Sequence, residues 1–287
     1  MRTSEWIQAG FATILALAAW VAPLSTKRRW AITFFGLFAV CAILLARATS
    51  LVLSESASTA LRDWLPVALT LIPYYQAGQF FTGPNEKIQD QLIALDRRLL
   101  SFVPHLGPRW ERVAHQIMEW AYMMCYAIIP LGLAVLYAAG LRREASTFWF
   151  LVLVPTYFCY SFTPFVPALP PRSLGKQPAA AKPIRLRVFN LWLLKYGSIQ
   201  AISFPSAHVA ASLAVSLVLL RTVPIAGVIF LFVTFWIAVA AVGGGYHYAS
   251  DVLLGAATTL LVFAAWDAHL IPSTLITALA VALTAPF

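Results

Sequence analysis

Two histidines and one aspartate are the side chains of this protein best suited to chemistry. His208 ends the stretch Ser-Phe-Pro-Ser-Ala-His at 203–208, and His247 and Asp251 follow three glycines at 243–245. His247 and Asp251 are four residues apart, so on a helix both project from one face, where the carboxylate can accept a hydrogen bond from the imidazole. An imidazole oriented in this way and facing a second imidazole provides a nucleophile, its orienting group and a proton donor. Phosphoryl transfer without a metal ion requires these three groups.

Apolar segments on either side must position these groups. The chain passes through an apolar stretch at 206–222, turns, and returns through a second one at 224–243. These two stretches predict a helical hairpin that brings both histidines to the same end. Ser203 is the predicted N-cap of the first helix. The free backbone N–H groups of that helix start, together with the Ser206 hydroxyl, would form a cradle for a phosphate.

The composition indicates a polytopic membrane protein. Hydrophobic residues make up 61% of the 287 residues and charged residues only 11%, whereas soluble domains carry roughly 25% charged residues. The apolar runs are continuous rather than alternating, which favours helices over a β-barrel. A span needs about 20 apolar residues. The predicted spans are 5–24, 30–53, 64–82, 114–140, 146–166, 206–222, 224–243 and 249–267.

The predicted fold class is all-α, a polytopic bundle with a core of six helices and two additional N-terminal spans. Residues 1–60 would form the N-terminal pair, 61–267 the helical membrane domain, and 268–287 an apolar C-terminal segment. Whether 270–286 crosses the bilayer is left open. The first span lacks a small-residue cleavage site and is interpreted as a retained helix rather than a signal peptide. The polar stretch 84–112 has helical apolar spacing and predicts an amphipathic helix on the membrane surface, with a role either in packing alone or in substrate access.

The long loop at 166–205 contains cations and no acidic residue. Arg172 follows a stiff proline pair, which would hold its guanidinium at a defined place suited to bidentate contact with an oxyanion. Four other cations of this loop are interpreted as topology signals or contacts with anionic lipid; these are Lys182, Arg185, Arg187 and Lys195. His115 and Glu119 could face the same cavity as the histidines, but an interfacial helix end explains them without chemistry, and this is the interpretation adopted. The three cysteines have no metal-type spacing and are expected to be structural.

These motifs resemble those of the phosphatidic acid phosphatase type 2 superfamily. Pro-Ser-Ala-His at 205–208 is similar to its Pro-Ser-Gly-His signature, and His247 and Asp251 match its His-x-x-x-Asp ending. The phrases around both histidines, and Pro-Ala-Leu-Pro-Pro-Arg at 167–172, look most like the branch of inositol phosphorylceramide synthases. The resemblance covers roughly residues 64–267. It implies that His247 takes the phosphoryl group, Asp251 orients it and His208 protonates the leaving group.

The resemblance also implies that Arg172 and Ser206 hold the phosphate oxygens, with no metal and no other cofactor. Two signature cations are missing. Position 165, upstream of Arg172, is Phe where the signature has a lysine, and Lys176 could substitute for that lysine from the other side. No arginine stands between Ala240 and Tyr246, and the backbone N–H groups of the glycines, that of Gly245 among them, could replace it.

The predicted function is therefore an integral-membrane lipid phosphatase or phosphotransferase that acts on a lipid phosphate or diphosphate through a phosphohistidine. Two alternatives are left open. The first is a transferase that moves a phospho-headgroup onto a lipid or polyol hydroxyl, and the second is a non-catalytic lipid-binding or transport protein. The expected partners are the bilayer and a membrane lipid, not nucleic acid. The oligomeric state is not predicted.

The orientation in the membrane rests on two arguments that disagree. With eight spans, 14 of the 20 Lys and Arg residues lie on the side of the 166–205 loop, and the positive-inside rule would place that side in the cytoplasm. The resemblance implies the outer face, periplasmic or lumenal. We adopt the outer face as the expectation.

Overall fold

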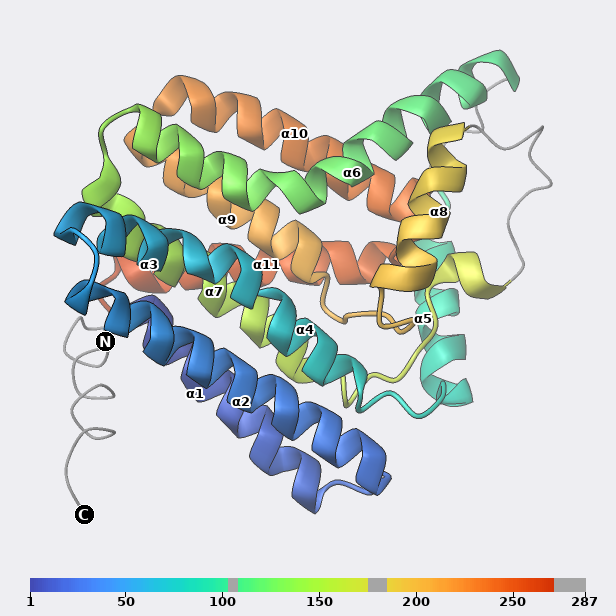
Figure 1. Ribbon diagram of the computed structural model, residues 1–287. Helices are drawn as coiled ribbons and strands as arrows, with labels where there is room; N and C mark the ends of the chain where they lie inside the picture. Colours follow the sequence, from blue (N-terminus) through green and yellow to red (C-terminus); the bar gives the residue numbers. More distant parts are fainter. Residues whose placement is uncertain (103–107, 175–184, 271–287) are drawn as a thin grey trace.

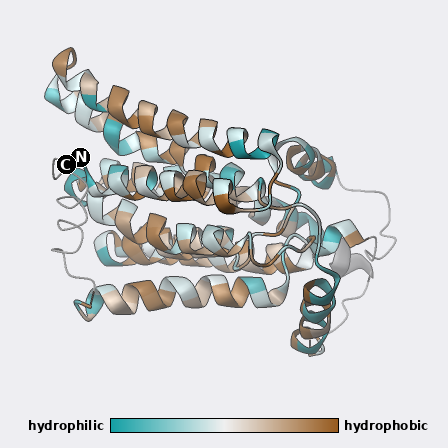
Figure 2. Cartoon of the chain, turned by 90° about the horizontal axis from the view of Figure 1, so that it is seen from below, coloured by the Kyte–Doolittle hydropathy of each residue, from teal (hydrophilic) through white to brown (hydrophobic). Residues whose placement is uncertain are grey.

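The computed structural model describes residues 1–102, 108–174 and 185–270, and within this part of the chain every regular element is a helix. Most of these helices lie roughly side by side, and two others, α5 (Glu86–Leu99) and α8 (Arg185–Gly197), lie across one end of the bundle (Figure 1). Most of the length of the long helices is hydrophobic, and hydrophilic residues gather toward the two ends (Figure 2). The predicted fold class, a polytopic helical membrane bundle, is confirmed.

Among the residues that the structure describes, six helical stretches are long and apolar enough to cross a membrane: Thr3–Val21, Thr26–Leu51, Val113–Ala138, Arg142–Phe162, Pro224–Gly243 and Ala249–Asp267. They correspond to α1 (Thr3–Val21), α2 (Thr26–Ala48) with the short η1 (Thr49–Leu51), α6 (Pro108–Ala138), η2 (Arg142–Glu144) with α7 (Ala145–Phe162), α10 (Pro224–Gly243) and α11 (Ala249–Asp267). The predicted span 206–222 is α9 (Ala207–Thr222), an apolar helix of 16 residues.

The span predicted at 64–82 is wrong in its boundaries. The helix α3 (Glu55–Leu69) begins nine residues earlier, and α4 (Leu71–Gly78) continues it after a break at Thr70. The predicted span begins directly after a charged pair, Arg62 and Asp63. In the structure Arg62 forms an ion pair with Glu5, and Asp63 pairs with Arg2. Because both charges are neutralised by partners on α1, the helix continues through them.

The surface helix is shorter than predicted. Of the stretch 84–112, only Glu86–Leu99 forms the separate helix α5, and α6 already begins at Pro108. The helix starts at its N-cap Asn85, whose side chain accepts a hydrogen bond from the Ile88 N–H. Leu92 is buried against Ala168, Ile202 and Tyr248. One face of α5 therefore packs on the loops at the end of the bundle. The run at 270–286 lies outside the described residues, apart from Leu270.

The core of the bundle surrounds α7, which packs against α1, α9 and α11. Its side chains from Phe148 to Leu153 are all buried. By contrast, large apolar side chains on the outer helices remain exposed, as expected for a surface that faces lipid; examples are Leu17, Phe34, Leu45, Phe232 and Leu261.

The N-terminal helices pack closely on the rest of the bundle. Phe11 of α1 stacks on Tyr157 of α7 with ring centroids 4.8 Å apart. The buried Gln76 of α4 donates through Nε2 to the carbonyls of Ala12 and Ile32, at 3.0 and 2.9 Å. One amide group thus joins α1 and α2 to α4. The division at residue 60 stays a prediction, and these contacts show that the two parts share an interface.

Candidate active site

The turn between α10 and α11 holds the pair that the spacing predicted. His247 Nδ1 lies 3.1 Å from Asp251 Oδ2, and both side chains are buried. Tyr248 is the N-cap of α11, and its backbone N–H donates to the same Asp251 oxygen at 3.0 Å. His247 therefore lies just before the helix rather than on it, and Asp251 caps the helix while it contacts the imidazole.

The second histidine lies opposite the first. His208 is in the first turn of α9, and its ring centroid is 5.6 Å from that of His247. The Ser206 backbone N–H donates to the Asp251 carbonyl at 3.0 Å, which joins the start of α9 to the start of α11. The predicted meeting of the two histidines at one end of the hairpin is confirmed. Their roles stay predictions.

The predicted helix cap is wrong by one turn. Ser206, not Ser203, is the N-cap of α9, and its fully buried hydroxyl accepts from the Val209 N–H at 3.5 Å. Phe204 and Pro205 keep Ser203 outside the helix, so Ser203 cannot reach its first N–H groups. The start of α9 leaves the earliest backbone N–H groups without intrahelical acceptors. Ser206 thus stands at a helix N-terminus beside both histidines, as a phosphate cradle requires.

Arg172 is held at a defined place, in the short helix η3 (Pro171–Leu174). Its backbone N–H donates to the Gly245 carbonyl at 2.9 Å. Its Nη1 reaches the Tyr246 carbonyl at 3.4 Å, and the guanidinium lies over the Tyr246 ring, 5.7 Å from the centroid. Burial, and then the positive charge of Arg172, lower the pKa of His247 below its usual value. The imidazole is therefore neutral at pH 7, the form in which it can act as a nucleophile.

Gly245 contributes differently from the prediction. Its backbone N–H donates to the Val242 carbonyl at 2.9 Å, so this group is already used within the turn. Its φ of 70° is in the left-handed region that favours glycine. The residue allows the chain to turn and directs its carbonyl to Arg172. The other predicted phosphate-binding residue, Lys176, lies outside the described residues.

Two residues that the sequence analysis set aside belong to this end of the molecule. Glu119 of α6 is fully buried and forms an ion pair with Arg187 of α8. Arg187 also donates through Nη2 to the Gly244 carbonyl at 3.2 Å. The interpretations of Arg187 as a topology signal and of Glu119 as an interfacial helix end are therefore wrong. An acid within an apolar span is costly unless it has a partner, and this signal could have identified Glu119.

The surface helix α5 also contacts the turn. Asp96 accepts a hydrogen bond from the Ala249 N–H through Oδ1 at 2.6 Å, and Ala249 is the first residue of α11. Gln89 bonds to the Tyr248 hydroxyl, which in turn donates to the Leu169 carbonyl at 3.0 Å. The turn that bears His247 is thus held from α5 as well as from its own helices.

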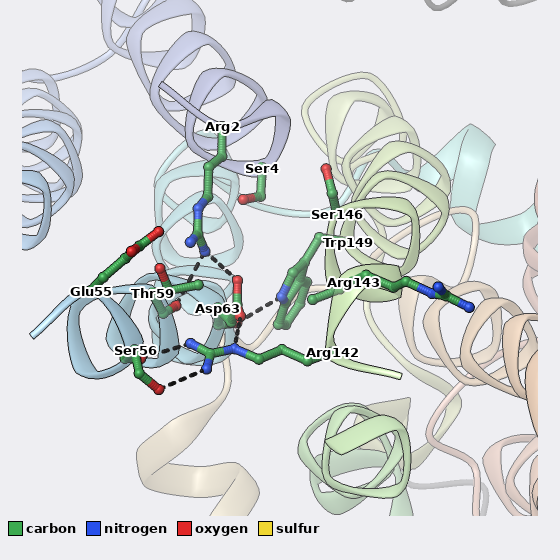
Figure 3. Close-up of a pocket in the computed structure, with 11 residues that line it drawn as sticks. Arg2, Ser4, Glu55, Ser56, Thr59, Asp63, Arg142, Arg143, Ser146 and Trp149 are labelled. Atoms are coloured by element: carbon green, nitrogen blue, oxygen red, sulfur yellow. Dashed lines mark hydrogen bonds and ion pairs between the residues drawn. The ribbon is translucent and has the colours of Figure 1, made fainter. Parts of the chain in front are cut away.

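A cavity of about 560 Å³ lies at the opposite end of the bundle (Figure 3). Asp63 accepts there from Arg2 and, through Oδ2, from Arg142 at 3.3 Å and the Tyr137 hydroxyl at 2.6 Å. Arg142 also donates to the hydroxyl and the carbonyl of Ser56. These bonds join α1, α3, α6 and the start of α7, so we assign the cluster to packing of the N-terminal helices.

The fold and the site define a class of protein: a multi-pass helical membrane protein with a His/His/Asp cluster at one end. A family model of the PAP2 superfamily matches residues 90–265, and the chain belongs to this superfamily. The match includes all of His208, His247 and Asp251. No curated protein and no solved structure matches the chain. Among the described residues, no cluster of His, Cys, Asp and Glu has the composition of a metal site.

Proposed function

We propose that this protein is an integral-membrane lipid phosphatase or phosphotransferase that works through a phosphohistidine at His247. One observation carries the proposal: His247 is 3.1 Å from the buried Asp251, and the His208 ring lies opposite at 5.6 Å. Membership of the PAP2 superfamily supports this type of activity. A neutral imidazole oriented by a carboxylate beside a second imidazole is the arrangement of a nucleophile with its acid–base partner.

The first half-reaction follows from this geometry. With Nδ1–H donated to Asp251, the lone pair of His247 Nε2 attacks the phosphorus. The bond from phosphorus to the lipid oxygen breaks, and His208, which is protonated when the anionic phosphate is bound beside it, gives its proton to that oxygen, which leaves as the alcohol. Arg172 and the start of α9 at Ser206 bind the phosphoryl oxygens, where negative charge is concentrated.

In the second half-reaction, water attacks the phosphohistidine and gives its proton to His208. The bond between phosphorus and Nε2 breaks, phosphate leaves, and both histidines return to their starting protonation states. Neither half-reaction consumes a cofactor. An alcohol in place of water would give the phosphate monoester of that alcohol by the same steps. With a phosphodiester substrate, whose phosphorus keeps its headgroup on His247, the alcohol would give a phosphodiester.

The experiment that tests the proposal is phosphate release from a panel of lipid phosphates by the detergent-purified protein in EDTA. We expect release by the wild-type protein and none by His247→Ala or Asp251→Ala. Arg172→Ala should chiefly raise KM, by roughly 10- to 100-fold, because it removes a charge-assisted contact to the phosphate. Equal activity of His247→Ala and the wild-type protein would refute the phosphohistidine mechanism and leave a lipid-binding or transport protein as the explanation.

The acceptor is the second part of the proposal. The phrases Phe-Pro-Ser-Ala-His at 204–208 and His-Tyr-x-x-Asp-Val at 247–252 resemble the inositol phosphorylceramide synthase branch and favour an alcohol. Free phosphate formed without any added acceptor would identify a phosphatase. Product that appears only after a lipid or polyol alcohol is added would identify a transferase.

We place the active site at the outer face of the membrane. The proposal follows the resemblance rather than the positive-inside count, since several cations at this end are engaged at the site. Arg172 and Arg187 both contact the turn that precedes α11. Cations that hold a site contribute to the count without indicating orientation.

A further inference from the structure

Tyr246, the residue before His247, is the centre of a buried polar cluster that the proposed mechanism does not use. Its hydroxyl donates to Glu119 Oε2 at 2.5 Å. Asn190 donates to the same oxygen at 2.6 Å and to the Glu119 carbonyl at 3.0 Å. Arg187 bonds to the other carboxylate oxygen. We call these residues the Glu119 cluster; its members are Glu119, Arg187, Asn190 and Tyr246.

The ring of Tyr246 connects this cluster to the proposed catalytic groups. It stacks on Tyr122 with centroids 3.7 Å apart, and Tyr122 lies parallel to His208 at 6.0 Å. The guanidinium groups of Arg172 and Arg187 both lie over the Tyr246 ring, at 5.7 and 5.6 Å. The side chain therefore contacts Arg172 directly and reaches His208 through Tyr122, and its backbone leads directly into His247.

Burying these polar and charged groups costs free energy, and a contribution to stability alone does not explain why the bundle contains them. Glu119 is fully buried, and Asn190 and Tyr246 are almost so. Replacing a buried ion pair with apolar side chains is often neutral or stabilising, so a bundle that needed only cohesion could be built without these charges. Buried hydrogen bonds differ from apolar contacts in that they fix direction as well as distance.

We propose that Glu119, Arg187 and Tyr246 are positioning residues for phosphoryl transfer: the Glu119 cluster fixes the Tyr246 ring, and the ring fixes Arg172 and the turn that bears His247. The proposal rests on the function proposed above. Arg187 takes part from α8, 59 residues before Tyr246 in the chain. A guanidinium thus reaches the turn that carries no arginine of its own between Ala240 and Tyr246.

The test weakens the hydrogen bond between the Tyr246 hydroxyl and Glu119 from either side. Tyr246→Phe keeps the ring and loses the hydroxyl, and Glu119→Gln keeps the shape and loses the charge. Each change should lower kcat/KM for a lipid phosphate by about tenfold, the effect of one hydrogen bond to a charged group. Because both act through the same bond, the double variant should lose little more than either single one. Tyr196→Phe and Glu144→Gln are the matched controls, because both side chains lie away from the cluster.

A second measurement separates positioning from stability and does not require turnover. Inorganic phosphate should raise the Tm of the wild-type protein, and this rise should be much smaller in Tyr246→Phe and Arg187→Lys. Lysine keeps the charge of Arg187, but its single ammonium group cannot bond to both Glu119 and the Gly244 carbonyl as the planar guanidinium does. If Glu119→Gln does not fold, Tyr246→Phe decides the matter.

The outcomes distinguish the two proposals. Two outcomes would overturn the positioning role and leave the proposed function intact. In the first, the variants have a lower Tm, but their kcat, their KM and the increase in Tm caused by phosphate are unchanged. In the second, the losses in kcat/KM of the two single variants add fully in the double variant. A wild-type protein that turns over no lipid phosphate would refute the proposed function. The increase in Tm caused by phosphate would then test the positioning role by itself. A smaller increase in the variants than in the wild-type protein supports the role. An equal increase in the variants, or no increase in the wild-type protein, overturns it.

Discussion

At the scale of single residues, Asp251 serves two structural purposes with one oxygen. Oδ2 accepts from the Tyr248 N–H at 3.0 Å and lies 3.1 Å from His247 Nδ1. The first contact caps α11, and the second orients the imidazole. The position of the ring is therefore tied to the start of a helix rather than to a flexible loop, which is the kind of support that a proposed nucleophile needs.

The depressed pKa of His247 predicts how stability depends on pH. In the folded protein, burial and Arg172 hold this pKa below the value of about 6.5 that an unfolded chain shows. Below pH 6.5 the unfolded state therefore binds the proton more readily, and the stability present at pH 7 decreases as the pH falls toward the folded pKa. We expect the Tm of the wild-type protein to fall between pH 7 and pH 5, and that of His247→Gln to fall less. Parallel curves for the two proteins would contradict the assignment.

Residue spacing predicted His208, His247 and Asp251 but missed the Glu119–Arg187 pair. The first three belong to short motifs whose residues meet because they flank one hairpin. Glu119 and Arg187 are 68 residues apart and lie on different helices. A single sequence carries no information about which distant partner an isolated buried charge has. The identity of the partner had to come from the packing of α8 on α6.

At the scale of elements, close contact between α9 and α11 brings the two halves of the site together. Gly255 of α11 faces the backbone of Ser206, and a Cβ at this position would lie 2.4 Å from the Ser206 carbonyl oxygen. The same Ser206 donates its N–H to the Asp251 carbonyl. The glycine thus permits the approach that places His208 opposite His247.

Gly255→Ala should therefore separate α9 from α11. We expect a loss of roughly 1–3 kcal/mol in the free energy of unfolding, typical of overpacking, together with a large loss of phosphate release. Gly10→Ala is the control, because a Cβ there meets nothing within 4 Å and alanine is the better helix former. Thermal unfolding in detergent and the phosphate assay measure both effects. A Gly255→Ala protein as stable and active as the Gly10→Ala protein would contradict this account.

Hydropathy predicted the helices well, except where charge interrupts an apolar run. The boundary of α3 was wrong because Arg62 and Asp63 are polar in sequence yet paired in the structure. The N-cap of α9 was predicted wrongly because two serines, Ser203 and Ser206, could each cap a helix. Composition cannot decide between them, since the choice depends on where the chain leaves the extended backbone.

At the scale of the whole molecule, the two ends of the bundle have different polar architectures. One end holds the His/His/Asp cluster with Arg172 and Arg187, and the other holds the Asp63 cluster with Arg2 and Arg142. Both ends contain cations with defined partners. The total of positive charges therefore does not establish which end faces the cytoplasm.

Cysteine labelling in intact cells tests the orientation. In a background with Cys41, Cys125 and Cys159 replaced by alanine, Ser173→Cys would report the end with the proposed active site, and Ser146→Cys the opposite end. Both serines are exposed. We expect an impermeant maleimide to label Ser173→Cys from outside and Ser146→Cys only after permeabilisation. The reverse pattern would place the site in the cytoplasm, as the positive-inside count suggests.

The bond between Asp96 and the Ala249 N–H gives the amphipathic helix a mechanical link to the chemistry. Leu92 of α5 rests on the loops beneath the helix, while Leu95 and Leu99 of α5 and Phe102, which follows it, remain exposed. A displacement of α5 would act on the amide that begins α11, two residues after His247. If lipid headgroups or membrane curvature shift α5, the hydrogen bond between Asp96 and the Ala249 N–H transmits that shift to the turn that holds the proposed nucleophile.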